Sequence, residues 1–231
     1  MRDLFEENEQ PVISVDAKKK ELIGNFHQNG TAWRESPIAV NDHDFPSDAL
    51  GKIVPYGIYD TVLNDAFVCI GYSHDTACFA VDSIVLWYLR QGRYLYDDLQ
   101  GVLILADGGG SNASNSRGFK YFLQHNFCNR FNISATVCHY PPGSSKWNPI
   151  EHRLFSAISS NFAGTPLTSY EVAQGYIDQT SNESGLTVES DVSEYEYCTG
   201  YQISNADFRE INIIHHDTLP QWNYSIYPSR R

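Results

Sequence analysis

One apolar run that ends at an acid and three glycines constrains this chain more than any other stretch. Val102 to Ala106 are five consecutive apolar residues, and Asp107 follows them directly, ahead of Gly108–Gly110. A short apolar run ended by glycine is typical of a strand buried on both faces of a sheet. Ligands of open α/β sheets collect just beyond the carboxyl ends of the strands. Asp107 is therefore placed for chemistry, although Asp-Gly after a strand is also an ordinary turn signal.

The composition indicates a folded protein with an acidic surface. The 231 residues include 15 Tyr and 12 Phe, enough for a sizeable core. Residues 164–231 hold ten acidic and three basic residues, and so contribute −7 of the net charge of −12. An acidic chain disfavours a strong non-specific grip on nucleic acid, but it leaves open binding through cations that the acids hold. No stretch suggests a membrane span or a secretory leader, so we expect a cytoplasmic protein without a membrane partner.

Periodicity predicts several strands and then helices that alternate with strands. The expected strands are 11–16, 21–26, 52–59, 66–71, 101–106 and 133–138. The expected helices are 77–92, 116–130, 149–162 and 169–179. We expect the second strand to return beside the first, and the third and fourth to form a hairpin. This order predicts an α/β fold, in which a mixed sheet carries helices on its faces. We assign residues 1–165 to this core and 166–231 to a helical and irregular extension that packs on it.

Three acids occupy related places in this scheme. Asp16 ends the first strand, Asp107 ends the central strand, and Glu151 lies in the first turn of a later helix. Carboxylates from three elements can meet at one rim of a sheet, where like charges raise one another's pKa unless cations lie between them. Two Mg²⁺ ions held there can activate a hydroxyl and stabilise the leaving oxygen of a phosphodiester. Simpler roles remain open, because Asp16 could open a lysine-rich turn and Glu151 could close a capping box with Asn148.

The segments around these acids resemble the ISAzo13-type insertion-sequence transposases. They are 12–25, 104–112 and 139–156, of which the last is the most specific. Shorter segments that resemble the same family are 40–46, 55–60, 74–77 and 221–225. The resemblance covers nearly the whole chain. It implies an RNase H-like fold, with a five-stranded mixed sheet and helices on both faces, and a DDE catalytic triad of Asp16, Asp107 and Glu151.

The same resemblance implies the chemistry of DNA cleavage and strand transfer. Water activated by Mg²⁺, for which Mn²⁺ can substitute, would cut a phosphodiester at a transposon end, and the freed 3′ hydroxyl would attack target DNA. Asp16 would bridge two metal ions, and Asp107 and Glu151 would each hold one. The expected partners are therefore DNA, at transposon ends and target, and further copies of the chain in a homo-oligomer or other transposase subunits.

Polar residues beside the acids are candidates for contacts with DNA. Lys146 and Arg153 flank Glu151 and can bind phosphate, although a role as solvated surface charges is equally open. Ser111 and Asn112 follow the glycines after the central strand, and capping of the next helix would also explain them.

The resemblance carries one expectation about the extent of the chain. Members of the family generally have an amino-terminal region of the helix-turn-helix kind, whereas Met1 stands only 15 residues before Asp16. We therefore expect an amino-terminally truncated catalytic domain. The alternative is a catalytically silent or regulatory fragment that acts by binding transposase subunits.

Overall fold

A mixed sheet forms the centre of the molecule. The computed structural model describes residues 1–141 and 143–229. Within them the sheet has nine strands, in the order β7-β4-β3-β1-β5-β6-β9-β8, with β2 attached to β3. The strands are β1 (Val12–Ala17), β2 (Glu21–Ile23), β3 (Gly51–Asp60), β4 (Asp65–Gly71), β5 (Gly101–Ala106), β6 (Ser134–His139), β7 (Thr187–Val192), β8 (Ile213–His215) and β9 (Asn223–Ile226).

The five central strands confirm the expected mixed core. β3 and β4 form the predicted antiparallel hairpin, β1 pairs antiparallel with β3, and β1, β5 and β6 run parallel to one another. The expected pairing of residues 21–26 with the first strand is wrong. The strand is shorter, and β2 pairs with β3 instead, with Glu21 opposite Ile53. The physical reason is that β1 already has β3 on one side and β5 on the other.

The carboxyl-terminal part of the chain enlarges this core at both edges. β7 pairs parallel with β4, while β9 pairs antiparallel with β6 and β8 with β9. These strands cover the main-chain groups that β4 and β6 would otherwise leave open at the edges of the sheet. Residues 166–231 thus add strands as well as helices to the core. The domain boundary at residue 165 stays a prediction.

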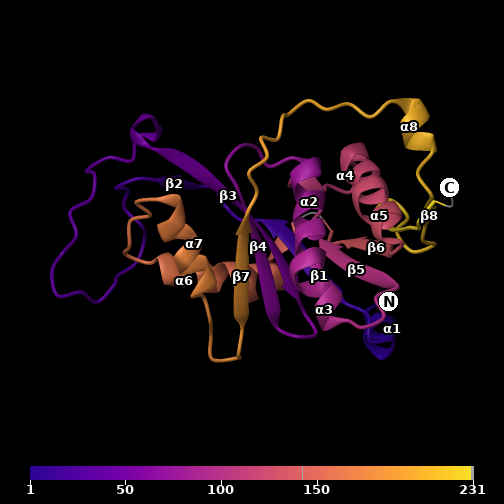
Figure 1. Ribbon diagram of the computed structural model, residues 1–231, viewed down its shortest axis with the longest axis horizontal. Coiled ribbons are helices and arrows are strands. Elements are labelled where there is room, and N and C mark those ends of the chain that lie inside the picture. Colours follow the sequence, from indigo (N-terminus) through magenta and orange to yellow (C-terminus); the bar gives the residue numbers. More distant parts are fainter. Residues whose placement is uncertain (142, 230–231) are drawn as a thin grey trace.

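Helices cover both faces of the sheet (Figure 1). The α-helices are α1 (Arg2–Glu7), α2 (Ala77–Trp87), α3 (Arg93–Leu95), α4 (Arg117–Phe122), α5 (Asn129–Phe131), α6 (Ser156–Phe162), α7 (Tyr170–Asp178) and α8 (Asn205–Arg209). The π-helical turns are η2 (Tyr88–Gly92), η4 (Leu123–Cys128) and η6 (Glu151–Phe155). The 3₁₀ turns are η1 (Pro46–Asp48), η3 (Gly110–Asn112) and η5 (Ser145–Trp147). No helix in the described ranges is long and apolar enough to cross a membrane.

Two apolar clusters lie on opposite faces of the sheet. The first joins β1, β3 and β5 to α2, α4 and η4, and it includes Ile13, Val15 and Ile104. The second joins β2, β3 and β4 to η6, α6 and α7, and it includes Ile150 and Leu154. Because side chains alternate along a strand, the position of a residue in its strand decides which of these two faces its side chain points to.

The helix that begins next to Glu151 lies very close to β3 at Gly57. A Cβ atom on Gly57 would stand 2.6 Å from Cε1 of Phe155 and 2.9 Å from Cδ1 of Ile150. Gly57 is also the residue that pairs with Asp16 across β1 and β3. The absence of a side chain at this position therefore lets η6 approach the strand that carries Asp16.

The Gly57→Ala substitution tests this close approach. We expect it to lower the free energy of unfolding by about 1–3 kcal/mol, because the new methyl group overpacks a filled core. The matched control is Gly175→Ala in α7, where a Cβ atom meets nothing within 4 Å. That change should leave stability equal or raise it by up to about 1 kcal/mol, since alanine favours the helix. Urea denaturation measures both, and equal stabilities of the two variants would contradict the packing argument.

Candidate active site

Asp16 and Asp107 lie at the same end of two neighbouring parallel strands. β1 and β5 pair with Val15 opposite Ala106, so that the next residue along each chain is an acid. Neighbouring strands in a sheet are about 4.8 Å apart. The structure thus brings these two sequence-predicted acids together at the carboxyl edge of the parallel strands, where α/β sheets bind their ligands.

Glu151 approaches this edge from the helical layer. Val15 packs into the cluster beneath α2, so alternation directs Ser14 and Asp16 to the opposite face, which η6 and α6 cover. The Ser14 Oγ donates a buried hydrogen bond to Oδ1 of Asn148, three residues before Glu151. This bond ties the start of the Glu151 helix to β1, two residues before Asp16.

The helix start differs in one respect from the capping box suggested by the sequence. The helix begins at Pro149, as expected. The Asn148 side chain, however, binds Ser14 rather than a backbone N–H, because Asn148 is fully buried against β1. No hydrogen bond within the described part of the chain reaches the carboxylate of Glu151. Its capping role is therefore absent, and the carboxylate is left without a structural partner.

The negative charges at this edge act on one another. Burial, and then the charges of Asp107 and Glu151, raise the pKa of Asp16 to about 7. Burial and the charge of Asp107 also raise the pKa of Glu151. The Oδ1 of Asp16 accepts the Ala17 N–H at 2.8 Å, and Oδ1 of Asp107 accepts the Gly109 N–H at 3.0 Å. None of the ion pairs among the described residues includes any of the three acids, and the charges of His152 and Lys18 offset the rise in the pKa of Glu151 only in part.

The donors at this edge suit a hard divalent cation, because they are all carboxylate oxygens. As the side chains stand, no group of three or more His, Cys, Asp or Glu residues in the described ranges forms a ready metal cage. Mg²⁺ rarely requires such a cage, since it is commonly held by one or two carboxylates together with water and substrate phosphate. Asp16 and Asp107, adjacent and without cationic partners, match that smaller requirement.

Two of the predicted DNA-binding residues are exposed near Glu151. Lys146 lies in η5, with its Nζ 5.4 Å from the centroid of the Trp147 ring, and Arg153 lies in η6. Both side chains are exposed, and neither takes part in an ion pair within the described residues. The structure thus leaves both cationic groups open to solvent on the segment that carries Glu151.

The other two predicted DNA-binding residues are buried. Ser111 and Asn112 lie in η3, and Asn112 is completely inaccessible to solvent. They do not cap α4, because Ser116 accepts the Phe119 N–H in that role. The carbonyl oxygen of Asn112 instead lies 2.8 Å from Nε2 of His139, at the end of β6. That contact anchors the loop after Asp107 to the neighbouring strand, so Asn112 supports the site from within.

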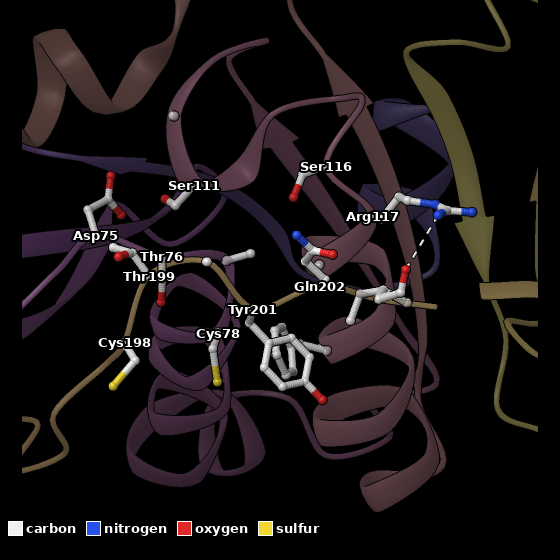
Figure 2. A pocket seen from close by; sticks show the side chains of 16 residues that line it. Asp75, Thr76, Cys78, Ser111, Ser116, Arg117, Cys198, Thr199, Tyr201 and Gln202 are labelled. Atoms are coloured by element: carbon white, nitrogen blue, oxygen red, sulfur yellow. Dashed lines mark hydrogen bonds between the residues drawn. The ribbon is translucent and has the colours of Figure 1, made fainter. Parts of the chain in front are cut away.

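Asp75 is a further acid near this edge, directly before α2. Thr76, not Asp75, caps α2 by accepting the Phe79 N–H at 3.2 Å, so the Asp75 carboxylate has no capping role. The charge of Asp75 contributes to the raised pKa of Asp16. Figure 2 shows Asp75 near Ser111, in a cavity of about 670 Å³ between the amino-terminal ends of α2 and α4. The resemblance of residues 74–77 to the family was the only sequence signal for it.

The raised pKa of Asp16 predicts a pH-dependent stability. The folded state holds the Asp16 proton more tightly than the unfolded chain, whose pKa is 3.8. The stability contributed by Asp16 is therefore fully present below pH 3.8 and is lost as the pH rises through about 7. Because asparagine cannot ionise, the Asp16→Asn variant should gain stability over the wild type by about 2–3 kcal/mol between pH 5 and pH 8.

Urea denaturation in EDTA at the two pH values measures this difference. The Asp48→Asn variant supplies the control, since it removes one exposed carboxylate in η1, outside the acidic edge. A constant difference in stability between wild type and Asp16→Asn at both pH values would contradict the raised pKa of Asp16, and with it the burial and crowding of this carboxylate.

Comparisons with known proteins agree with this fold. The Mos1 transposase paired-end complex with left transposon end has a TM-score of 0.51 and 12% identity, covering 77% of this chain and 50% of that chain. The pre-cleavage Mos1 transpososome gives the same four values. The present chain thus spans about half the length of these solved chains. The likeness shows the fold, and it confirms the RNase H-like class expected from the sequence.

A search among curated proteins finds no match. The family model described as the Rhodopirellula transposase DDE domain, in contrast, matches residues 2–228, almost the whole chain. The protein therefore belongs to this family of DDE transposase domains.

Proposed function

We propose that this chain is a transposase catalytic domain that cleaves DNA and transfers its strands, with Asp16, Asp107 and Glu151 as the catalytic triad. The observation that carries the proposal is the placement of Asp16 and Asp107 side by side at the carboxyl edge, within range of the charge of Glu151. Membership of a DDE transposase family supports DNA as the substrate. The same membership favours transposon ends and target DNA as the two partners of the reaction.

The triad would hold two Mg²⁺ ions, with Mn²⁺ as a substitute, and we assign Asp16 to both ions and Asp107 and Glu151 to one each. Bound divalent ions would supply the positive charge that activates an attacking hydroxyl and stabilises a leaving oxygen. The acids themselves favour this assignment, because they are partly buried, mutually repelling and without cationic side-chain partners. An acidic protein can in this way attract a polyanion.

The remaining residues of the site would orient the acids and the DNA. The Ser14–Asn148 hydrogen bond holds the Glu151 helix to β1, and the Asn112–His139 contact holds the loop after Asp107 to β6. Lys146 would contact phosphate from its exposed position in η5. Arg153 would do the same in η6, and further copies of the chain would complete a homo-oligomer on paired DNA ends.

Loss of one carboxylate at the edge tests the catalytic assignment. With Mg²⁺ or Mn²⁺, we expect the wild type to nick supercoiled plasmid DNA, and we expect Asp107→Asn to lower the rate about a hundredfold or more. A loss of this size corresponds to about 3 kcal/mol of transition-state stabilisation. The control Asp48→Asn, which removes an exposed acid far along the chain in η1, should keep the wild-type rate. Gel electrophoresis of the nicked product measures the rate.

Two results would overturn the assignment. Cleavage that is independent of added metal would remove the role of the carboxylates as ion ligands. Equal metal-dependent rates for wild type and Asp107→Asn would remove Asp107 from the triad. A wild type that folds and binds DNA, but cleaves none, would favour the silent or regulatory fragment.

A further inference from the structure

A groove lies directly beside Glu151, on the face of the sheet that η6 and α6 cover. It encloses about 530 Å³. The lining residues on which the argument depends are Lys18, Lys19, Gln28, Asn29, Glu151 and Ser159. The groove is therefore built from the lysine-rich turn after Asp16, the irregular segment after β2, and one side of the helix that carries Glu151.

The walls of this groove present hydrogen-bonding groups that the protein does not use. The side chains of Gln28, Asn29 and Ser159 form no hydrogen bonds within the described ranges, whereas Ser156 Oγ already donates to the carbonyl oxygen of His152 at 2.5 Å. Amide and hydroxyl groups of this kind, together with Lys and Arg, make most protein contacts to the phosphates and sugars of DNA. The unused donors thus match the chemistry of a nucleic acid backbone.

The charges in the groove also match a phosphate chain. Lys18 is largely buried and forms an ion pair with Glu21 at 2.6 Å, so these two lining residues neutralise each other. Lys19 is exposed and has no ion-pair partner among the described residues. Glu151 is then the remaining acid in the groove, and it lies where the proposed metal ions would offset its charge.

The cavity on the other side of the Asp107 loop is less suited to phosphate. It contains the carboxylate of Asp75, and its cation Arg117 already donates to Asn205 Oδ1 at 2.8 Å. The carboxyl-terminal part of the chain, which supplies its outer wall, carries a net charge of −7 over residues 164–231. In the Glu151 groove, by contrast, the Lys19 side chain makes no hydrogen bond or ion pair among the described residues, so its ammonium group is free to bind a phosphate.

We propose that the Glu151 groove holds the sugar–phosphate backbone of the DNA strand that enters the acidic edge. Lys19 contacts a phosphate, and Gln28, Asn29 and Ser159 donate hydrogen bonds to backbone oxygens. These contacts do not depend on base sequence, because phosphates carry no sequence information. The inference rests on the proposed function for the identity of the strand, and it adds the path that this strand takes across the protein.

Neighbouring serines on α6 provide the most direct test. Ser159 lines the groove, whereas Ser160 is exposed on the same helix and does not line it. Ser159→Glu and Ser160→Glu change the net charge of the protein equally, so they differ only in where the new carboxylate lies. We expect Ser159→Glu to weaken binding of a mixed-sequence DNA duplex about tenfold more than Ser160→Glu, as like charges then face each other. Fluorescence anisotropy of labelled duplex measures both affinities.

The salt dependence of binding tests the cation itself. Lys19→Gln should lower the slope of log affinity against log salt by about 1, the value for one lost phosphate contact. The matched control is Lys52→Gln on β3, which lines a different cavity and should leave the slope unchanged. Lys19→Arg should restore the wild-type slope, because it keeps the charge.

The outcomes separate this inference from the proposed function. Three results would each overturn the proposal that this groove binds DNA. They are equal affinities of the two serine variants, an unchanged salt slope in Lys19→Gln, and no DNA binding by the wild type. A serine difference of the expected size in a wild type that shows no metal-dependent cleavage would support the groove and overturn the catalytic function instead.

Discussion

Repulsion among carboxylates at one edge of the sheet is the constraint on which the rest of this structure depends. Asp16 and Asp107 end neighbouring parallel strands. The charge of Asp107 raises the pKa of Glu151 on the facing helix, and the charges of Asp107 and Glu151 raise that of Asp16. Burial first, and then the neighbouring like charges, disfavour the ionised carboxylate, which is why the pKa of Asp16 rises to about 7. This arrangement of carboxylates does not stabilise the fold. It is typical of a site that binds positively charged ions.

The surrounding structure opposes that repulsion through packing and buried hydrogen bonds. Gly57 leaves space for η6 beside the strand that carries Asp16. The bond from Ser14 to Asn148 fixes the start of the helix to that same strand. Gly57 pairs with Asp16, and Ser14 and Asn148 lie two and three residues before Asp16 and Glu151. Both contacts therefore hold the Glu151 helix close to Asp16. The Glu151 groove begins at this helix, and Lys19, which lines it, adds a positive charge beside the acidic edge.

Much of the core followed from sequence patterns, whereas the fine positioning did not. The apolar run before Asp107 predicted a buried central strand, and β5 occupies that place because alternate residues such as Ile104 pack beneath α2. The capping role of Asn148 could not be excluded from spacing, since its partner Ser14 lies 134 residues earlier. Lys19 read as part of a turn, because only the folded chain places it in the same groove as Glu151. Long-range partners of this kind have no local sequence signature.

Binding of Mn²⁺ in the absence of DNA tests the central claim most directly, because it asks whether the three carboxylates hold a divalent ion. Electron paramagnetic resonance of free Mn²⁺ can follow the titration of wild type, Asp16→Asn and Glu151→Gln, with Asp48→Asn as the control. The account predicts binding by wild type and Asp48→Asn, and a loss of about tenfold or more in affinity for each triad variant, as a ligand is removed. Equal affinities for all four proteins, or no binding by the wild type, would contradict it.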